Sequence, residues 1–76
     1  VWLSVDLDVF SSSYAPGTSN NWPEGMPPRE FSPFMDEILK SDLRGLGLYE
    51  IVPKLDVDDK TSKLAATLIH HYVESL

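Results

Sequence analysis

Residues 1–10 read Val-Trp-Leu-Ser-Val-Asp-Leu-Asp-Val-Phe, and this stretch indicates the class of fold. Val1, Leu3 and Val5 alternate with Trp2 and Ser4, so both faces of the expected strand are largely apolar. Successive side chains of a strand point to opposite faces, and a strand that is apolar on both faces is typical of a parallel sheet covered by helices. The stretch therefore predicts a buried strand over residues 1–9 of an α/β domain.

Two carboxylates, Asp6 and Asp8, come at the end of this expected strand. Residues two apart on a strand share a face, with their Cα atoms roughly 6.5 Å apart. Carboxylates on one face repel each other unless a cation lies between them, and oxygen ligands suit Mg²⁺, Ca²⁺ or Mn²⁺. Ligands of open parallel sheets bind beyond the carboxyl ends of the strands. The pair indicates a divalent metal site; the alternative is a solvated strand end without a function.

The length and the charge limit the size of the domain and the class of partner. A chain of 76 residues buries only a small core, so we expect residues 1–76 to be the C-terminal part of a single larger domain that does not fold alone. The net charge of −6 argues against nucleic acid as a partner. The sequence contains no apolar run long enough to span a membrane, no signal-like segment and no cysteine. We expect a soluble, cytoplasmic protein.

A long loop is expected over residues 10–27, which are rich in Ser, Asn, Gly and Pro. Loops of this length inside compact domains are usually functional or disordered. Tyr14, Trp22 and the prolines favour an ordered loop, and its position directly after the carboxylates suggests a wall of the site. The alternative is a mobile surface loop.

A helix is predicted after this loop and is expected to end at about Lys40. It starts either at Pro28 or one turn later at Ser32-Pro33, because proline is tolerated at the first position of a helix. Apolar residues recur at helical spacing on one stripe, which we assign to the core. They are Phe31, Phe34, Met35, Ile38 and Leu39.

Residues 45–53 read Gly-Leu-Gly-Leu-Tyr-Glu-Ile-Val-Pro and predict a second buried strand that ends at the proline. Strand, helix and strand in this order form a βαβ unit with a right-handed crossover. If the strands are parallel, Glu50 lies at the same edge of the sheet as Asp6 and Asp8. A charged residue in so apolar a strand is seldom buried without a partner. We interpret Glu50 as the third acidic residue of the site; the alternative is an internal salt bridge.

Residues 56–61, Asp-Val-Asp-Asp-Lys-Thr, precede a second predicted helix. They lack the central glycine and distal glutamate of a calcium-binding EF-hand, so we expect Asp58, Asp59 or Thr61 to cap the helix. His70 and His71 are adjacent, face different directions on a helix and are expected at the surface. The helix is expected to pack through Leu64, Ala65, Leu68, Ile69, Tyr72, Val73 and Leu76.

Short motifs follow one another along the chain. They are Ser4-Val5-Asp6-Leu7-Asp8, Ala15-Pro16-Gly17-Thr18, Gly25-Met26 with Arg29-Glu30, Tyr49-Glu50-Ile51-Val52-Pro53, Leu55-Asp56, and Thr61 with Leu64-Ala65-Ala66. In this order they resemble the C-terminal part of the ureohydrolases, the superfamily of arginase, agmatinase and formimidoylglutamase. The resemblance implies an α/β fold, a three-layer α/β/α sandwich with a mostly parallel sheet, of which this chain would form a βαβα part. It also implies a homo-oligomer.

The resemblance further implies a binuclear manganese centre that hydrolyses a small amidine or guanidino substrate. Asp6 would bridge two Mn²⁺ ions and Asp8 would bind one of them, while the remaining ligands would come from the rest of the domain. Glu50 would face the cationic group of the substrate, so that Asp6 and Glu50 are the implied catalytic residues. Water shared by two cations has a lowered pKa, and its hydroxide would attack the C=N carbon that Glu50 orients.

Two departures from the family pattern bear on the substrate. Ser11-Ser12 stands where arginases and agmatinases usually have Asp-Pro, and Glu50-Ile51-Val52-Pro53 replaces Glu-x-Asn-Pro. The first departure, together with Arg29-Glu30-Phe31, is more similar to the formimidoylglutamase branch, which converts N-formimidoyl-L-glutamate and water to glutamate and formamide in histidine breakdown. Agmatinase and arginase remain alternatives. The loss of both motifs also leaves open a catalytically silent structural or regulatory subunit.

Overall fold

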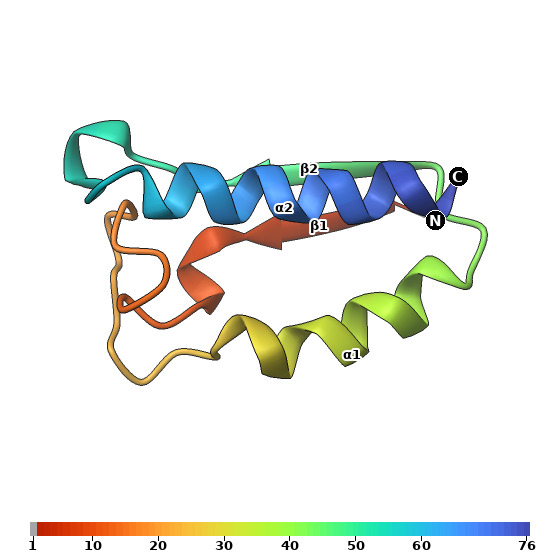
Figure 1. Cartoon of the computed structure of the whole chain (residues 1–76), viewed down its shortest axis with the longest axis horizontal. Coiled ribbons are helices and arrows are strands. Elements are labelled where there is room, and N and C mark those ends of the chain that lie inside the picture. Colours follow the sequence, from red (N-terminus) through yellow and green to blue (C-terminus); the bar gives the residue numbers. More distant parts are fainter. Residues whose placement is uncertain (1) are drawn as a thin grey trace.

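The computed structural model describes residues 2–76 and has the predicted β-α-β-α order (Figure 1). Its elements are β1 (Trp2–Asp6), η1 (Leu7–Val9), α1 (Pro28–Leu39), β2 (Gly45–Tyr49), η2 (Pro53–Leu55) and α2 (Lys60–Ser75), where η denotes a short 3₁₀ helix. The two strands form a parallel sheet. The α/β class and the parallel βαβ unit predicted from the sequence are therefore confirmed.

The register of the sheet determines which residues meet at its carboxyl edge. Trp2 is opposite Gly45 and Asp6 is opposite Tyr49, so both strands run to the same edge and end there together. Figure 1 shows this edge facing the loop of residues 10–27, at the end of the molecule away from the C-terminus.

Both strands are shorter than the sequence predicts. β1 ends at Asp6 instead of residue 9, and β2 ends at Tyr49 instead of residue 53, while residue 1 lies outside the described part of the chain. The ladder between the two strands stops at the pair of Asp6 and Tyr49. Beyond it the chain turns into η1, where Phe10 donates its backbone N–H to the Leu7 carbonyl at 3.3 Å. A strand continues only where a neighbour supplies hydrogen-bond partners, and apolar alternation does not report where that neighbour ends.

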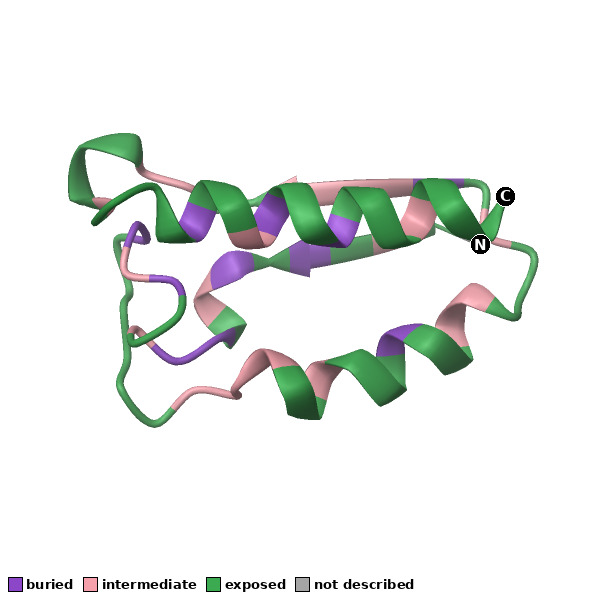
Figure 2. Ribbon diagram, viewed as in Figure 1, coloured by how far each residue is buried: buried purple, intermediate pink, exposed green. Residues whose placement is uncertain are grey.

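The core lies where both helices pack against the face of the sheet that carries Val5 (Figure 2). Its buried apolar residues are Val5, Leu7, Phe10, Ala15, Met35, Ala65 and Leu68. The rings of Phe10 and Phe31 meet edge to face, with their centroids 5.2 Å apart. This contact fastens the beginning of the long loop to α1, since aromatic pairs favour such an arrangement.

Helix α1 begins at Pro28, the earlier of the two predicted starts, and Pro33 lies inside it. The predicted apolar stripe is buried or half-buried except at Phe34, which is 59% exposed. Successive helical residues are about 100° apart, which places Phe34 to one side of the line through Phe31, Met35 and Ile38. The prediction that Phe34 belongs to the core is therefore wrong for this part of the chain.

Helix α2 buries one side of its predicted apolar stripe. Ala65 and Leu68 are buried, whereas Ile69, Val73 and Leu76 are exposed and were wrongly expected in the core. His70 and His71 are exposed, as predicted. Within residues 2–76, neither helix combines the length and apolar character that crossing a bilayer requires.

The loop of residues 10–27 is packed against the carboxyl edge of the sheet. Ser11 donates its backbone N–H to the Met26 carbonyl at 3.0 Å, and Met26 donates to the Val9 carbonyl at 2.9 Å. Three of its residues are completely buried, namely Phe10, Ala15 and Thr18. The loop thus forms a wall at this edge, as expected from the sequence.

The reason for this packing differs from the one that the sequence suggested. Tyr14 and Trp22 were expected to order the loop, but they are 41% and 59% exposed. Backbone hydrogen bonds, the buried Phe10 and small buried residues such as Ala15 and Thr18 hold the loop instead. Such contacts have no periodic signature in the sequence.

Candidate functional site

The three acidic residues singled out from the sequence lie at the carboxyl edge of the sheet. Asp6 is the last residue of β1, Asp8 lies in η1, and Glu50 directly follows β2. Because Asp6 is opposite Tyr49 in the parallel register, Glu50 comes one residue beyond the neighbour of Asp6. The structure therefore brings segments that are more than forty residues apart in sequence to a single edge.

No carboxylate of these three takes part in a hydrogen bond or an ion pair with any other residue of the described range 2–76. The ion pairs found there join Lys40 to Glu37, Arg44 to Asp42 and His70 to Glu74. Asp6 and Glu50 are exposed and Asp8 is half-buried. The internal salt bridge considered for Glu50 is thus not found within this part of the chain, and all three carboxylates are available to a ligand.

Asp6 and Asp8 are not related as two residues of one strand, as the sequence suggested. The 3₁₀ helix η1 begins at Leu7, so the strand spacing of about 6.5 Å does not apply to this pair. Leu7 is completely buried between them, while Asp6 is exposed and Asp8 is half-buried. The turn anchors the backbone through Leu7 and leaves a carboxylate on each side of it outside the core.

The chemistry of Asp6 and Asp8 fits a hard divalent cation, although the chain does not supply a complete site. Carboxylate oxygens suit Mn²⁺, and both groups lack a competing partner in residues 2–76. Across that same range, no group of three or more His, Cys, Asp or Glu side chains gathers into a potential metal site. The chain therefore fits the role of supplying two ligands, and a full coordination sphere needs residues from elsewhere.

Glu50 adopts a left-handed backbone conformation, with φ of 70°. A non-glycine residue in this region costs about 1–3 kcal/mol and persists only where its surroundings over-determine it. Such residues cluster at binding and catalytic sites. The strain makes Glu50 a functional candidate on grounds that are independent of its charge.

Replacing Glu50 by glycine should keep the free energy of unfolding unchanged or raise it by up to about 1 kcal/mol, because glycine adopts positive φ without steric cost. The measurement is urea unfolding of the full-length protein. Glu37→Gly is the matched control: Glu37 is exposed inside α1, where glycine should lower the free energy by about 1 kcal/mol. Equal destabilisation by both variants would show that the side chain of Glu50 supports the fold.

Asp56 holds the beginning of α2, so the prediction that Asp58, Asp59 or Thr61 caps this helix is wrong. The Asp56 carboxylate accepts the backbone N–H of Thr61 at 3.0 Å and that of Ser62 at 3.2 Å. Asp58 and Asp59 have φ of 52° and 57° and turn the chain back, so that the earlier Asp56 reaches the helix end. No side-chain hydrogen bond caps the helix from Asp59.

The charge of Asp56 is stabilised by these contacts. Desolvation raises the pKa of its carboxyl, but the hydrogen bonds from Thr61, Ser62 and Val57 outweigh that effect and lower the pKa from 3.8 to about 2. Asp56 is consequently ionised at neutral pH, where it accepts the N–H groups of the helix end.

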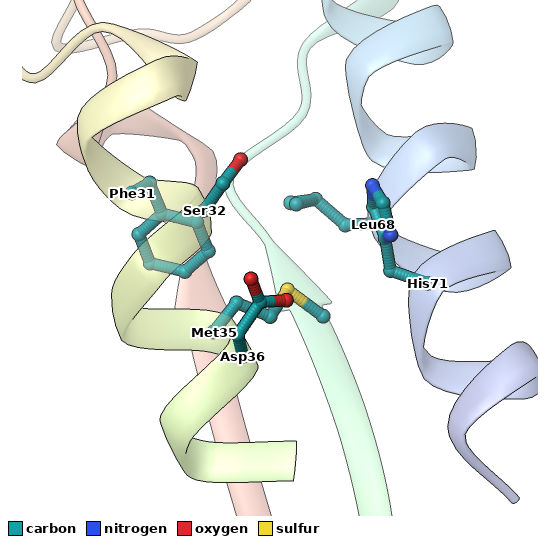
Figure 3. Close-up of a pocket in the computed structure, with 6 residues that line it drawn as sticks. All are labelled: Phe31, Ser32, Met35, Asp36, Leu68 and His71. Carbon is teal, nitrogen blue, oxygen red and sulfur yellow. The ribbon is translucent and has the colours of Figure 1, made fainter.

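A separate, small hollow lies between α1 and α2 (Figure 3). It is lined by Phe31, Ser32, Met35, Asp36, Leu68 and His71. In the described residues the Ser32 hydroxyl donates to the Pro28 carbonyl at 3.1 Å and is bonded to neither Asp36 nor His71. None of the three site carboxylates lines this hollow, and the candidate site remains the sheet edge.

Comparison with known proteins adds the family to this geometry. The model of the arginase family matches residues 1–74. The chain belongs to the arginase family. A formimidoylglutamase of Halobacterium salinarum is 39% identical over 75 residues, which cover 96% of this chain and 24% of that protein. The resemblance to the ureohydrolases expected from the ordered motifs is confirmed.

Solved structures of the arginase family share the fold of this chain. Formimidoylglutamase from Bacillus subtilis superposes with a TM-score of 0.89 at 32% identity, over 97% of this chain and 23% of that one. Arginase from Bacillus subtilis superposes with a TM-score of 0.87 at 30% identity, over 96% and 28%. The chain spans about a quarter of the length of the curated relatives it matches.

Gly17 and Thr61 have no site role predicted from the sequence, although both belong to motifs of the resemblance. Gly17 donates its backbone N–H to Thr61 Oγ1 at 2.7 Å and accepts the N–H of Val52 at 2.6 Å. The motifs themselves were the available signal, but a bond across 44 residues follows from no local pattern.

Proposed function

We propose that the complete protein is a metal-dependent hydrolase that cleaves a C–N bond of a linear amidine. We further propose N-formimidoyl-L-glutamate as the substrate, with glutamate and formamide as products. The observation that carries this proposal is the meeting of Asp6, Asp8 and Glu50 at one sheet edge, unpaired within residues 2–76, in a chain of the arginase family. The names of the relatives support the choice of substrate.

Asp6 and Asp8 are proposed as manganese ligands. Asp6 and Asp8 would hold Mn²⁺ through their carboxylates, and other parts of the domain would supply the remaining ligands. When bound, two Mn²⁺ ions lower the pKa of a shared water and make hydroxide available near neutral pH. The two aspartates also neutralise part of the positive charge, since an anionic oxygen ligand is a preferred partner of a hard cation.

Glu50 is proposed to orient the substrate. Its carboxylate accepts charge-assisted hydrogen bonds from the cationic nitrogens of the amidine. This pairing directs the electrophilic carbon toward the Asp6 edge, and such positioning lowers the barrier to attack by removing unproductive orientations. Addition of water to the carbon and cleavage of the C–N bond release the amine, with an acidic group relaying the proton to it.

Residues 1–76 are proposed to form part of a single ureohydrolase-like domain that assembles into a homo-oligomer. Two features support further protein covering this chain. The Thr18 hydroxyl is buried without a hydrogen-bond partner in residues 2–76, and a buried polar group normally has one. Trp2 and Tyr49 are 60% and 46% exposed on the sheet.

The manganese-loaded full-length protein should hydrolyse N-formimidoyl-L-glutamate with a kcat/KM at least about tenfold above that for agmatine or L-arginine, because a site that pairs with a substrate's polar groups rejects compounds lacking them. The measurement is formamide and urea release under identical conditions, with chelator-treated protein as the control. Preferred urea release would indicate the arginase or agmatinase alternative. No hydrolysis of any of the three by metal-loaded protein would indicate a silent subunit.

A further inference from the structure

Gly17 connects the two segments that leave the candidate site. It lies in the loop that follows Asp8, and both of its backbone polar groups bond to the segment that follows Glu50. Its carbonyl accepts the N–H of Val52 at 2.6 Å, and its N–H donates to Thr61 Oγ1 at 2.7 Å. Figure 1 shows this loop beside the beginning of α2, at the carboxyl edge of the sheet.

The hydrogen bonds continue from Thr61 into Asp56. Thr61 is completely buried, and its backbone N–H donates to Asp56 Oδ1 at 3.0 Å. Gly17, Thr61 and Asp56 therefore form one connected set of hydrogen bonds, which we call the Gly17 clamp. It joins the long loop to the start of α2.

Gly17 is required by the space inside the clamp. A Cβ atom built on it would lie 2.9 Å from Cβ and Cγ of Asp56 and 2.9 Å from Thr61 Oγ1. Contacts this short force neighbouring atoms apart. The backbone conformation of Gly17 does not demand glycine, since its φ is not positive. The glycine therefore serves the close approach of two segments.

The clamp acts on Glu50 through the backbone. Glu50 keeps a strained φ of 70°, which requires that the chain be held on both sides of it. On one side Tyr49 pairs with Asp6 in the sheet. On the other side Val52, two residues further, is bonded to Gly17. Releasing Gly17 would let the segment relax and carry the Glu50 carboxylate away from Asp6 and Asp8.

We propose that Thr61, through the Gly17 clamp, is a positioning residue that holds Glu50 in register with the metal-binding carboxylates. This inference rests on the proposed function, because it gives the clamp a role in placing the substrate. Thr61 does not touch the substrate; it acts through Gly17 and Val52 on the backbone of Glu50.

The test compares Thr61→Val, Thr61→Ser and Thr67→Val in the full-length manganese-loaded enzyme. Valine keeps the shape of threonine but removes the acceptor for Gly17, whereas serine retains the hydroxyl. Thr67→Val is the matched control, since Thr67 is exposed on the same helix and its hydroxyl donates to the Lys63 carbonyl at 2.9 Å. Measured quantities are kcat, KM, bound manganese and amide hydrogen exchange at residues 17 and 50–52.

Thr61→Val should lower kcat about tenfold and raise KM at unchanged manganese content, because small displacements of a positioning group are costly. Thr61→Ser and Thr67→Val should keep both parameters near those of the wild type. A role in stability alone would lower the yield of folded enzyme and leave KM unchanged. Wild-type kcat and KM in folded Thr61→Val enzyme would overturn the proposal.

Two further measurements keep the outcome decisive. If Thr61→Val does not fold, Asp56→Asn weakens the same clamp while keeping its shape, and an unchanged KM in that variant overturns the proposal equally. If wild-type enzyme hydrolyses no amidine, the proposed function fails by itself. Amide exchange then tests the clamp separately: residues 17 and 50–52 should lose protection in Thr61→Val and keep it in Thr61→Ser, and equal protection in both would contradict the clamp.

Discussion

Asp6→Asn in the full-length enzyme is expected to lower kcat/KM by more than about 100-fold and to release most of the bound manganese, since even residues that merely support metal ligands contribute ~10–100-fold. Asparagine keeps the size of the side chain but removes the charge that would neutralise two cations. Steady-state kinetics and metal analysis after dialysis measure the two effects. Loss of metal together with activity distinguishes a ligand from a residue that only contacts substrate.

Asp36→Asn is the matched control for this variant. Asp36 is exposed on α1 and lines the hollow between the helices, not the sheet edge. The Asp36→Asn variant should keep both turnover and manganese content at wild-type values. Unchanged manganese content and turnover in Asp6→Asn would contradict a metal site at this edge and, with it, the proposed reaction.

Glu50→Gln is expected to lower kcat/KM about 100-fold while manganese content stays at the wild-type level, because removing one charge of a desolvated pair costs ~2–5 kcal/mol. Glutamine preserves the shape and one acceptor oxygen, but it replaces the other oxygen by an NH₂ donor and no longer neutralises the cationic amidine. Steady-state kinetics with N-formimidoyl-L-glutamate and metal analysis are the measurements.

Glu37→Gln serves as the control for Glu50→Gln, since Glu37 is exposed on α1 and pairs with Lys40 at 2.9 Å. It should leave activity unchanged. A Glu50→Gln enzyme that loses manganese would assign Glu50 to the metal rather than to the substrate. A Glu50→Gln enzyme that keeps full activity would contradict a role of Glu50 in the site. The Glu50→Gly variant complements this experiment, because it tests whether activity can be lost without loss of stability.

Asp6, Asp8 and Glu50 could be located from the sequence because each follows a strongly apolar run. Parallel strands in a βαβ unit end at the same edge, so the order of elements is sufficient to bring these residues together. Their detailed geometry could not be predicted in the same way. The turn at Leu7 and the positive φ of Glu50 depend on where the ladder between β1 and β2 stops, and the alternation of side chains continues past that point.

The capping of α2 illustrates a second limit of sequence reasoning. Asp58 and Asp59 stand closest to the helix in sequence and were the natural candidates for a cap. In the structure both occupy a left-handed turn, and Asp56 reaches the helix end instead. Asp56, Asp58 and Asp59 have the same propensity to cap a helix. The backbone path between them therefore determines which one caps α2.

The sequence by itself determined the α/β class, the β-α-β-α order and the resemblance that identified the family, and it limited the start of α1 to Pro28 or Ser32-Pro33. These properties depend on periodicity, proline and short motifs, which are local to each segment. Only the tertiary structure decided where the strands end, how Glu50 is strained and that Gly17 bonds to Thr61, 44 residues away. Such contacts arise when distant segments pack together, and their partners are set by the path of the whole chain rather than by neighbouring residues.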